Sequence, residues 1–225
     1  MPTPPFTSLH RVDRTLTRIR ARGPAEVASL ALDRLRSWYR SDETLLLMVR
    51  EAGPVELPET SLRFRPATRA DAAAYARDIG TDSARTFVQR LQPGTRCFVV
   101  EDDRRFLHAS WVTTDKAWTR EIAAYLAPPE GDAYVYESFT RADARGRGVY
   151  PIALAGIVSQ LAEEGTTRVW VGVDERNAPS RRAIAKANFE EGFRLPYSRR
   201  WGRLSVGPAS GPLAAYAGSF LVRAT

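Results

Sequence analysis

The fold of this chain is decided by residues 133–188, which read AYVYESFT RADARGRGVY PIALAGIVSQ LAEEGTTRVW VGVDERNAPS RRAIAKAN. The first residues, 133–140, are mostly aromatic and β-branched, which predicts a strand. A glycine-rich turn at 145–150 follows, and apolar residues then recur at helical spacing over about 149–164. Strand, turn and helix in this order form the first half of a pattern that the rest of the stretch continues.

The second half of the stretch repeats the strand and the helix. Gly165-Thr-Thr breaks the first helix, and residues 168–174 (RVWVGVD) predict a second strand. Asn177-Ala-Pro-Ser opens a second helix that we expect to end near Asn188. Strands that alternate with helices in this way favour an α/β architecture.

The turn between the first strand and its helix has the chemistry of an anion site. Gly146 and Gly148 lack a Cβ, so the backbone there can turn tightly and approach a ligand closely. The amides that open the following helix have no intrahelical partner and point outward at the positive end of the helix dipole. Arg145 and Arg147 add guanidinium donors suited to phosphate oxygens. The turn is neither a P-loop, because no Gly-Lys-Ser/Thr follows, nor a dinucleotide fingerprint, because the third glycine is missing.

The turn and the second helix together resemble the GNAT superfamily of acyl-CoA-dependent N-acyltransferases. The pyrophosphate motif of that family, Gln/Arg-x-x-Gly-x-Gly/Ala, is matched by Arg145 and Gly148. The family's later asparagine is matched by Asn177, and the Gly-Phe pair that ends its next helix is matched by Asn188-Phe189.

This resemblance, which covers residues 62–203, implies a fold and a co-substrate. The fold is a central mixed α/β sheet flanked by helices, with strands 133–140 and 168–174 splayed apart to admit the arm of an acyl-CoA. The co-substrate is acetyl-CoA or another acyl-CoA. Asn177 and Ser180 contact it or only cap their helix, and Lys186 reaches a phosphate or is a solvated surface residue. The cofactor-binding residues implied are Phe139, Thr140, Arg145, Gly146, Arg147, Gly148, Val149, Tyr150, Asn177, Ser180 and Lys186.

Two positions depart from the family pattern. Tyr150 replaces the last small residue of the motif, and Pro151 follows it at an early helical position, where its missing N–H costs nothing. We expect the Tyr150 side chain to point away from the phosphates, into the core or toward the acceptor pocket. Many members of the family place a tyrosine that protonates the leaving thiolate seven residues after the asparagine, where this chain has Ile184. The usual general acid is therefore missing.

Acyl transfer needs a neutral amine, so the site requires a base that removes a proton from the ammonium form. Glu137 is the first candidate, because a carboxylate is unusual in an otherwise apolar strand. The alternative is that Glu137 faces solvent or pairs with an arginine such as Arg176. His108 is a second candidate base or acceptor contact, although a lone histidine in a strand is more often structural. Tyr150 and Tyr136 are candidate substitutes for the missing thiolate acid.

Composition narrows the class of protein further. The chain has 225 residues, one cysteine (Cys97) and two histidines (His10 and His108), which disfavours a disulfide and a metal site and predicts a cytoplasmic protein. No apolar run is long enough for a membrane span, and the N-terminus does not read as a signal peptide. The net charge of +7 is carried almost entirely by arginine. That charge favours anionic ligands such as CoA, whereas nucleic acid is unlikely because the arginines are spread along the chain.

We expect two regions in the chain. Residues 1–60 predict an N-terminal helical extension and a linker, with amphipathic helices at 9–21 and after Pro24 and a strand at 44–49. These helices could pack on the main domain, form a homodimer surface or bind an anionic surface. Residues 61–225 form the GNAT-like domain, in which we expect closing strands at 193–195 and 201–204.

The function predicted from the sequence is an N-acetyltransferase. It moves an acyl group from acyl-CoA to a primary amine of a small molecule by direct attack, with Glu137 assisting deprotonation. One alternative is a protein or peptide N-acetyltransferase. A further alternative, favoured by Ile184, is a catalytically silent module of the GNAT family that binds CoA or interacts with nucleic acid.

Overall fold

The computed structural model describes residues 40–56, 58–103, 105–119, 121–201 and 203–221. Its centre is an eight-stranded mixed sheet in the order β10-β9-β1-β8-β7-β4-β3-β2. The strands of this sheet are β1 (Arg40–Glu51), β2 (Arg63–Pro66), β3 (Thr95–Glu101), β4 (Phe106–Thr113), β7 (Ala133–Thr140), β8 (Arg168–Asp174), β9 (Glu190–Arg200) and β10 (Arg203–Val206).

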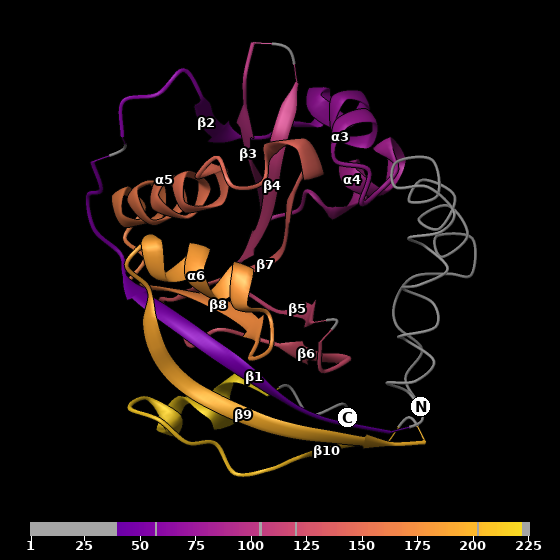
Figure 1. Ribbon diagram of the computed structural model, residues 1–225, viewed down its shortest axis with the longest axis vertical. Coiled ribbons are helices and arrows are strands. Elements are labelled where there is room, and N and C mark those ends of the chain that lie inside the picture. Colours follow the sequence, from indigo (N-terminus) through magenta and orange to yellow (C-terminus); the bar gives the residue numbers. More distant parts are fainter. Residues whose placement is uncertain (1–39, 57, 104, 120, 202, 222–225) are drawn as a thin grey trace.

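Helices cover both faces of this sheet, as the sequence predicted (Figure 1). On one face, α3 (Ala72–Asp78) and α4 (Ala84–Arg90) pack against alternate residues of β3 such as Cys97 and Val99. On the other face, α5 (Val149–Glu163) lies beside α6 (Ala178–Lys186). The smaller elements are β5 (Ala117–Thr119), β6 (Ala124–Leu126), α7 (Ala217–Phe220) and the short 3-10 helices η1 (Arg69–Asp71), η2 (Ala142–Ala144) and η3 (Ala214–Tyr216).

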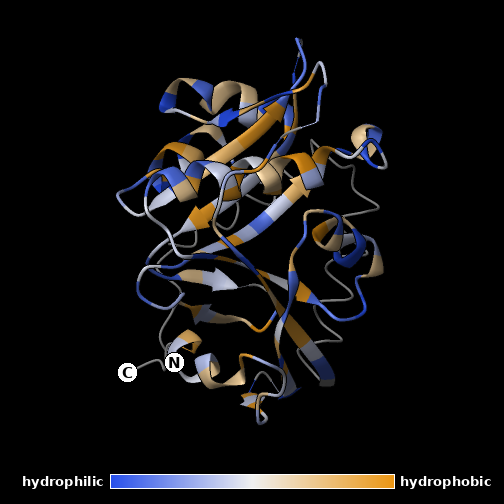
Figure 2. Ribbon diagram, turned by 90° about the vertical axis from the view of Figure 1, so that its left-hand side faces the viewer, coloured by the Kyte–Doolittle hydropathy of each residue, from blue (hydrophilic) through white to orange (hydrophobic). Residues whose placement is uncertain are grey.

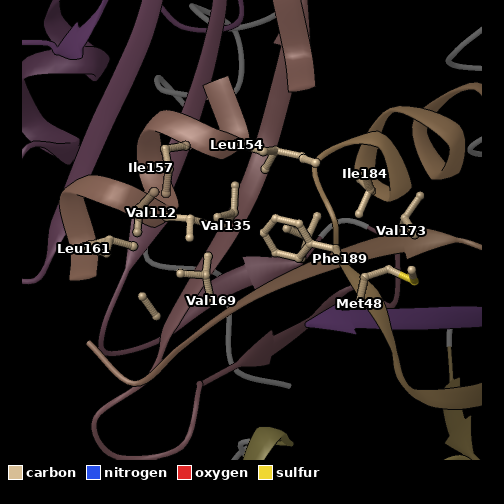
Figure 3. Packing of buried hydrophobic residues seen from close by; sticks show 14 of the residues in the cluster. Met48, Val112, Val135, Leu154, Ile157, Leu161, Val169, Val173, Ile184 and Phe189 are labelled. Carbon is tan, nitrogen blue, oxygen red and sulfur yellow. The ribbon is translucent and has the colours of Figure 1, made fainter. Parts of the chain in front are cut away.

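The core beneath α5 and α6 is built from apolar residues of these helices and of the strands that they cover. Leu154, Ile157 and Leu161 of α5 meet Val135 of β7 and Ile184 of α6 in one cluster (Figure 3). Apolar residues (orange) are concentrated along the strands and inward helix faces, and polar residues (blue) along the connecting turns (Figure 2). In the described part of the chain, no helix is long and apolar enough to cross a membrane.

The first strand changes the expected division of the chain. β1 lies inside the central sheet and is hydrogen-bonded antiparallel to both β8 and β9. Leu45, Leu46 and Leu47 are fully buried because both faces of β1 are covered. A boundary at residue 60 is therefore wrong for residues 40–51, which complete the sheet of the main domain. The helices expected at 9–21 and after Pro24 lie outside the described residues.

The C-terminal part also differs from the expected closing strands. β9 runs unbroken over Glu190–Arg200, longer than the expected 193–195, and β10 begins at Arg203 after a turn in which Trp201 has φ of 54°. Pro196 and the polar residues after it mask the strand pattern in the sequence, whereas pairing with β1 and β10 forms it in the fold.

The sheet opens between β7 and β8. These strands run parallel and pair only at Ala133–Val169, Tyr134–Trp170 and Val135–Val171, after which they separate. The splay expected between strands 133–140 and 168–174 is thus confirmed.

A β-bulge marks the point where β7 leaves its neighbour. Trp111 of β4 lies opposite Tyr136, but Ala109 lies opposite Phe139, so two residues of β7 stand against one of β4. Glu137 takes up the extra length in a left-handed conformation with φ of 47°. A non-glycine residue with such a φ carries strain and is frequent at functional sites.

Candidate functional site

The opening between β7 and β8 holds a cavity of about 760 Å³. Residues 134–140 of β7 form one wall, residues 171–173 of β8 form another, and the two are joined by the 144–151 turn and by α6. Of the residues expected to bind the co-substrate, those that line this cavity are Phe139, Thr140, Arg145, Gly146, Gly148, Val149, Tyr150, Asn177, Ser180 and Lys186. Arg147 is exposed and is not part of the lining.

The glycine turn takes the conformation that an anion site requires. Gly146 has φ of 78° and Gly148, the N-cap of α5, has φ of 74°. A Cβ on either glycine would meet nothing within 4 Å, so open space lies in front of the turn. The first amides of α5 face this space with no intrahelical partner, and the helix dipole adds to their positive potential.

Cationic side chains gather at the same end of the cavity. Arg145 is exposed and donates from Nε to the Thr140 carbonyl at 3.4 Å. Lys186 and Arg182 are exposed residues of α6 that also line the cavity. The sequence analysis missed Arg182, although its spacing from Lys186 (i, i+4) places both on one helix face.

The N-terminus of α6 is capped from within. Asn177 Oδ1 accepts a hydrogen bond from the Ser180 amide at 3.2 Å, which is the structural alternative considered for these residues. Asn188 follows the last turn with φ of 58°, the conformation that a glycine would adopt easily at this position. Ile184 is fully buried and lines the cavity, so this position of α6 offers the cavity no acidic proton.

His108 is fully buried on the face of β4 that α5 covers. Its Nδ1 lies 2.7 Å from Thr140 Oγ1, and its Nε2 lies 2.7 Å from Ser110 Oγ. Burial lowers the pKa of His108 from 6.5 to about 3, so the ring is neutral at physiological pH. Both ring nitrogens are thus engaged by hydroxyl groups, and the residue belongs to the cavity lining.

Tyr150 turns back onto the sheet, the direction expected from its size. Its ring stacks on His108 with 5.0 Å between centroids, and it packs against the apolar cluster that contains Ile184. The phenol hydrogen-bonds to Ser138, and burial raises its pKa to about 12. A phenol from α5 therefore lies close to the position that α6 leaves apolar.

Glu137 lies on the opposite face of the sheet, at the other end of the cavity. Its Oε2 accepts from Arg90 Nη1 at 2.7 Å, and the same nitrogen donates to Asp82. The Arg90 guanidinium lies 3.9 Å above the Trp111 ring. Burial opposes the charge on Arg90, but the carboxylates of Glu137 and Asp82 hold its pKa well above the usual range.

The arginine that pairs with Glu137 was not the one suggested by the sequence. Arg176 instead bonds to Glu43 at 2.6 Å and to Asp174 at 3.2 Å. Arg90 was missed because its partners come from separate elements, with Asp82 before α4 and Glu137 on β7. Of Asp82, Arg90 and Glu137, only Glu137 lines the cavity.

Further residues from the segment around β5 line the cavity. Trp118 and Thr119 of β5 and the exposed Glu121 belong to the lining, and Thr119 Oγ1 lies 3.2 Å from the hydroxyl of Tyr134. Tyr136 also lines the cavity, and burial raises the pKa of its phenol. No pattern in the sequence predicts β5, whose three residues lie between turns. No cluster of His, Cys, Asp and Glu suited to a metal ion occurs among the described residues.

The arrangement is that of a protein with a mixed sheet splayed around a central cavity, which faces a helix N-terminus at one end and a carboxylate at the other. The same fold is found in a putative GNAT-family acetyltransferase from Novosphingobium aromaticivorans (15% identity, TM-score 0.50, 70% of this chain and 63% of that one). It is also found in a GCN5-related N-acetyltransferase from Sphaerobacter thermophilus (16% identity, TM-score 0.51, 74% of this chain and 54% of that one). This chain therefore has the fold of the GNAT superfamily, as its motifs predicted.

A third structure with this fold is a Drosophila protein (13% identity, TM-score 0.50, 80% of this chain and 58% of that one). The chain thus spans less than two thirds of the length of each of these structures. By sequence, no protein-family model and no curated protein matches it.

Proposed function

We propose that this chain is an N-acyltransferase that moves an acetyl group from acetyl-CoA to a primary amine of a small molecule. The observation that carries the proposal is the cavity between β7 and β8, whose lining includes both the N-terminus of α5 and the carboxylate of Glu137. When bound, acetyl-CoA supplies a thioester whose carbonyl carbon an amine can attack. The remaining chemistry falls to side chains and amides of this chain.

The glycine turn suits the pyrophosphate of the co-substrate. Gly146 and Gly148 leave space for phosphate oxygens beside the first amides of α5. Arg145, Arg182 and Lys186 surround that space with positive charge, which balances a diphosphate. Separation of β7 from β8 leaves backbone groups at Phe139 and Thr140 beside the cavity, where an amide can stabilise a developing oxyanion.

At the other end, Glu137 receives the amine. The Glu137 carboxylate accepts a hydrogen bond from the buried Arg90 guanidinium and can attract an alkylammonium group. One of its oxygens is already engaged by Arg90. We therefore assign it the task of holding the ammonium and a water molecule that carries the proton away, with Tyr150 as the proton donor to the leaving thiolate.

Calorimetric titration with acetyl-CoA and with CoA tests the proposal. We expect both ligands to bind the wild-type protein and neither to bind Gly148→Glu, because the new carboxylate would occupy and repel the phosphate position. Gly165→Glu is the matched control, since Gly165 has φ of 84°, has nothing within 4 Å of its Cβ position and lies at the other end of α5. Binding by the control shows that the strain of a left-handed glutamate is not the cause of the loss.

Transfer is then measured as thiol release with a panel of amines. Absence of binding by folded wild-type protein would contradict the proposal, and so would binding that Gly148→Glu leaves unchanged. Binding without thiol release for any amine would favour a silent CoA-binding protein.

A further inference from the structure

The α5-facing side of β4 and β7 carries a continuous row of polar groups. Thr140 Oγ1 lies 2.7 Å from His108 Nδ1, and His108 Nε2 lies 2.7 Å from Ser110 Oγ. Ser110 Oγ lies 2.7 Å from Ser138 Oγ, and Ser138 hydrogen-bonds to the phenol of Tyr150. Each member of the row can both donate and accept a hydrogen bond.

Four members of the row, Thr140, His108, Ser138 and Tyr150, are part of the cavity lining, whereas Ser110 is not. His108 and Ser110 have no exposed surface. Buried polar groups must be satisfied by neighbours, so the order of contacts along the row is fixed by the fold. The neutral state of His108 leaves one ring nitrogen as a donor and the other as an acceptor, which allows all the hydrogen bonds to point the same way.

We propose that Thr140, His108, Ser110, Ser138 and Tyr150 form a proton relay that protonates the thiolate released during acyl transfer. This inference rests on the proposed function. Tyr150 touches the leaving group and is the catalytic residue, while Ser138, Ser110 and His108 act through it. The Nε2–H tautomer of His108 gives the relay its direction, from Thr140 toward Tyr150.

The proton balance of the step closes. The bound ammonium first loses one proton to the water held by Glu137, which gives the neutral amine. As the C–N bond forms and the C–S bond breaks, the nitrogen loses a second proton to water and the sulfur gains one from Tyr150, so that one proton in net is released to solvent. Ser138 donates to Tyr150, Ser110 to Ser138, and His108 Nε2–H to Ser110. His108 Nδ1 then takes the proton of Thr140, whose hydroxyl regains one from water in the cavity.

The relay accounts for the use of a phenol with a raised pKa. Tyr150 alone is a poor donor, because its pKa is raised to about 12 and a buried phenolate would be left behind. Concerted donation from Ser138 means that no phenolate accumulates. The same phenol packs with Ile184 in one cluster, so it serves the region that the usual tyrosine of α6 would reach.

Ser110→Ala is the decisive variant because Ser110 is not part of the cavity lining and can affect the reaction only through its neighbours. We expect kcat to fall roughly 10- to 100-fold, with the solvent isotope effect on kcat reduced and the Kd of acetyl-CoA changed less than about twofold. Thr95→Val is the matched control, since Thr95 pairs with Thr113 through hydroxyls 3.4 Å apart on the adjacent strands, outside the cavity. It should leave kcat and the isotope effect unchanged.

A readout without substrate tests the same connection. In NMR spectra of the free protein, Ser110→Ala should change the tautomer balance of His108, read from the imidazole ¹⁵N shifts, and the titration of Tyr150, read from its ring ¹³C shifts. His108 loses a direct neighbour in the relay, and Tyr150 loses one through Ser138. Thr140→Ser keeps the terminal hydroxyl and should retain activity, whereas Thr140→Val should behave like Ser110→Ala. If Ser110→Ala does not fold, comparison of Thr140→Ser with Thr140→Val tests the relay in its place.

The outcomes separate the relay from the function on which it rests. Wild-type turnover together with unchanged kcat and isotope effect in Ser110→Ala and Thr140→Val overturns the relay and leaves the acyltransferase standing. Failure of the wild-type protein to bind acetyl-CoA overturns both.

Discussion

His108 makes a specific contribution to the acid sensitivity of this protein. Its pKa in the folded protein is lowered to about 3 by burial, against 6.5 in the unfolded chain. The unfolded chain therefore binds one more proton than the folded protein between these two pH values, and stability falls as pH falls through this window. The contribution is present above pH 6.5 and is lost progressively toward pH 3.

The size of the effect follows from the two pKa values. Linkage gives a loss of about 2 kcal/mol between pH 7 and pH 5 and about 3 kcal/mol by pH 4 from this residue alone. The hydrogen bond from Arg65 lowers the pKa of Asp71 to about 2, so the contribution of this carboxyl to folding stability is also lost in acid. That loss is common to the wild-type protein and to His108 variants, so it cancels when the two are compared.

The assay is urea unfolding of wild type and His108→Asn at pH 7, 6, 5 and 4. We expect the difference in unfolding free energy between the two proteins to shift by about 2 kcal/mol in favour of the variant from pH 7 to pH 5. NMR of the imidazole should show a neutral ring in the folded wild-type protein down to about pH 4. Parallel pH profiles of the two proteins, or an imidazole that titrates near 6.5 while the protein is folded, would refute the reasoning.

Two further predictions concern packing and charge. Gly156→Ala should destabilise the fold by about 1–3 kcal/mol in urea unfolding. The reason is that the new Cβ would lie 2.5–2.7 Å from three ring atoms of Phe64. A loss of stability below about 0.5 kcal/mol would show instead that β2 and α5 can move apart. Arg90→Met should lower the free energy of unfolding by about 3–5 kcal/mol, because it removes the buried cation that contacts two carboxylates. Adding Glu137→Gln to Arg90→Met should recover part of that stability. Equal stability of the single and double variants would contradict the assigned pairing.

The backbone of the turn and the helix after it could be predicted from the sequence because both depend on local residues. Gly146 and Gly148 favour a left-handed backbone, which both adopt. The apolar periodicity after them predicts the helix and therefore the direction of its dipole. The positions of β7 and β8 were predicted correctly for the same reason, since each is a compact β-branched and aromatic run. Their separation followed only from the resemblance to the GNAT superfamily.

The rest of the site could not be predicted because it depends on partners distant in sequence. Arg90 meets Glu137 only because α4 packs across the sheet, and nothing in the segment around Arg90 marks it as buried. The place of β1 in the middle of the sheet is likewise set by pairing with β8 and β9, which a strand pattern at 44–49 does not reveal.

The bulge at Glu137 explains how one strand serves both halves of the proposed reaction. In a regular strand, neighbouring residues face opposite sides of the sheet. The left-handed conformation of Glu137 breaks this alternation, so that Tyr136 and Glu137 both contact Arg90 on the α4 side. Ser138 is then the first residue of the new register to face α5, where it meets Ser110 and Tyr150.

If Glu137 had a regular strand conformation, the alternation would carry its side chain to the α5 side and would turn Ser138 away from Ser110. The carboxylate would then lie among the relay hydroxyls, and its charge would oppose formation of a thiolate beside them. The bulge thus keeps the group proposed to hold the amine on one face and the groups proposed to carry the proton on the other, with the cavity between β7 and β8 open to both. The left-handed conformation of Glu137 produces this separation, and residues with such a backbone are frequent at functional sites.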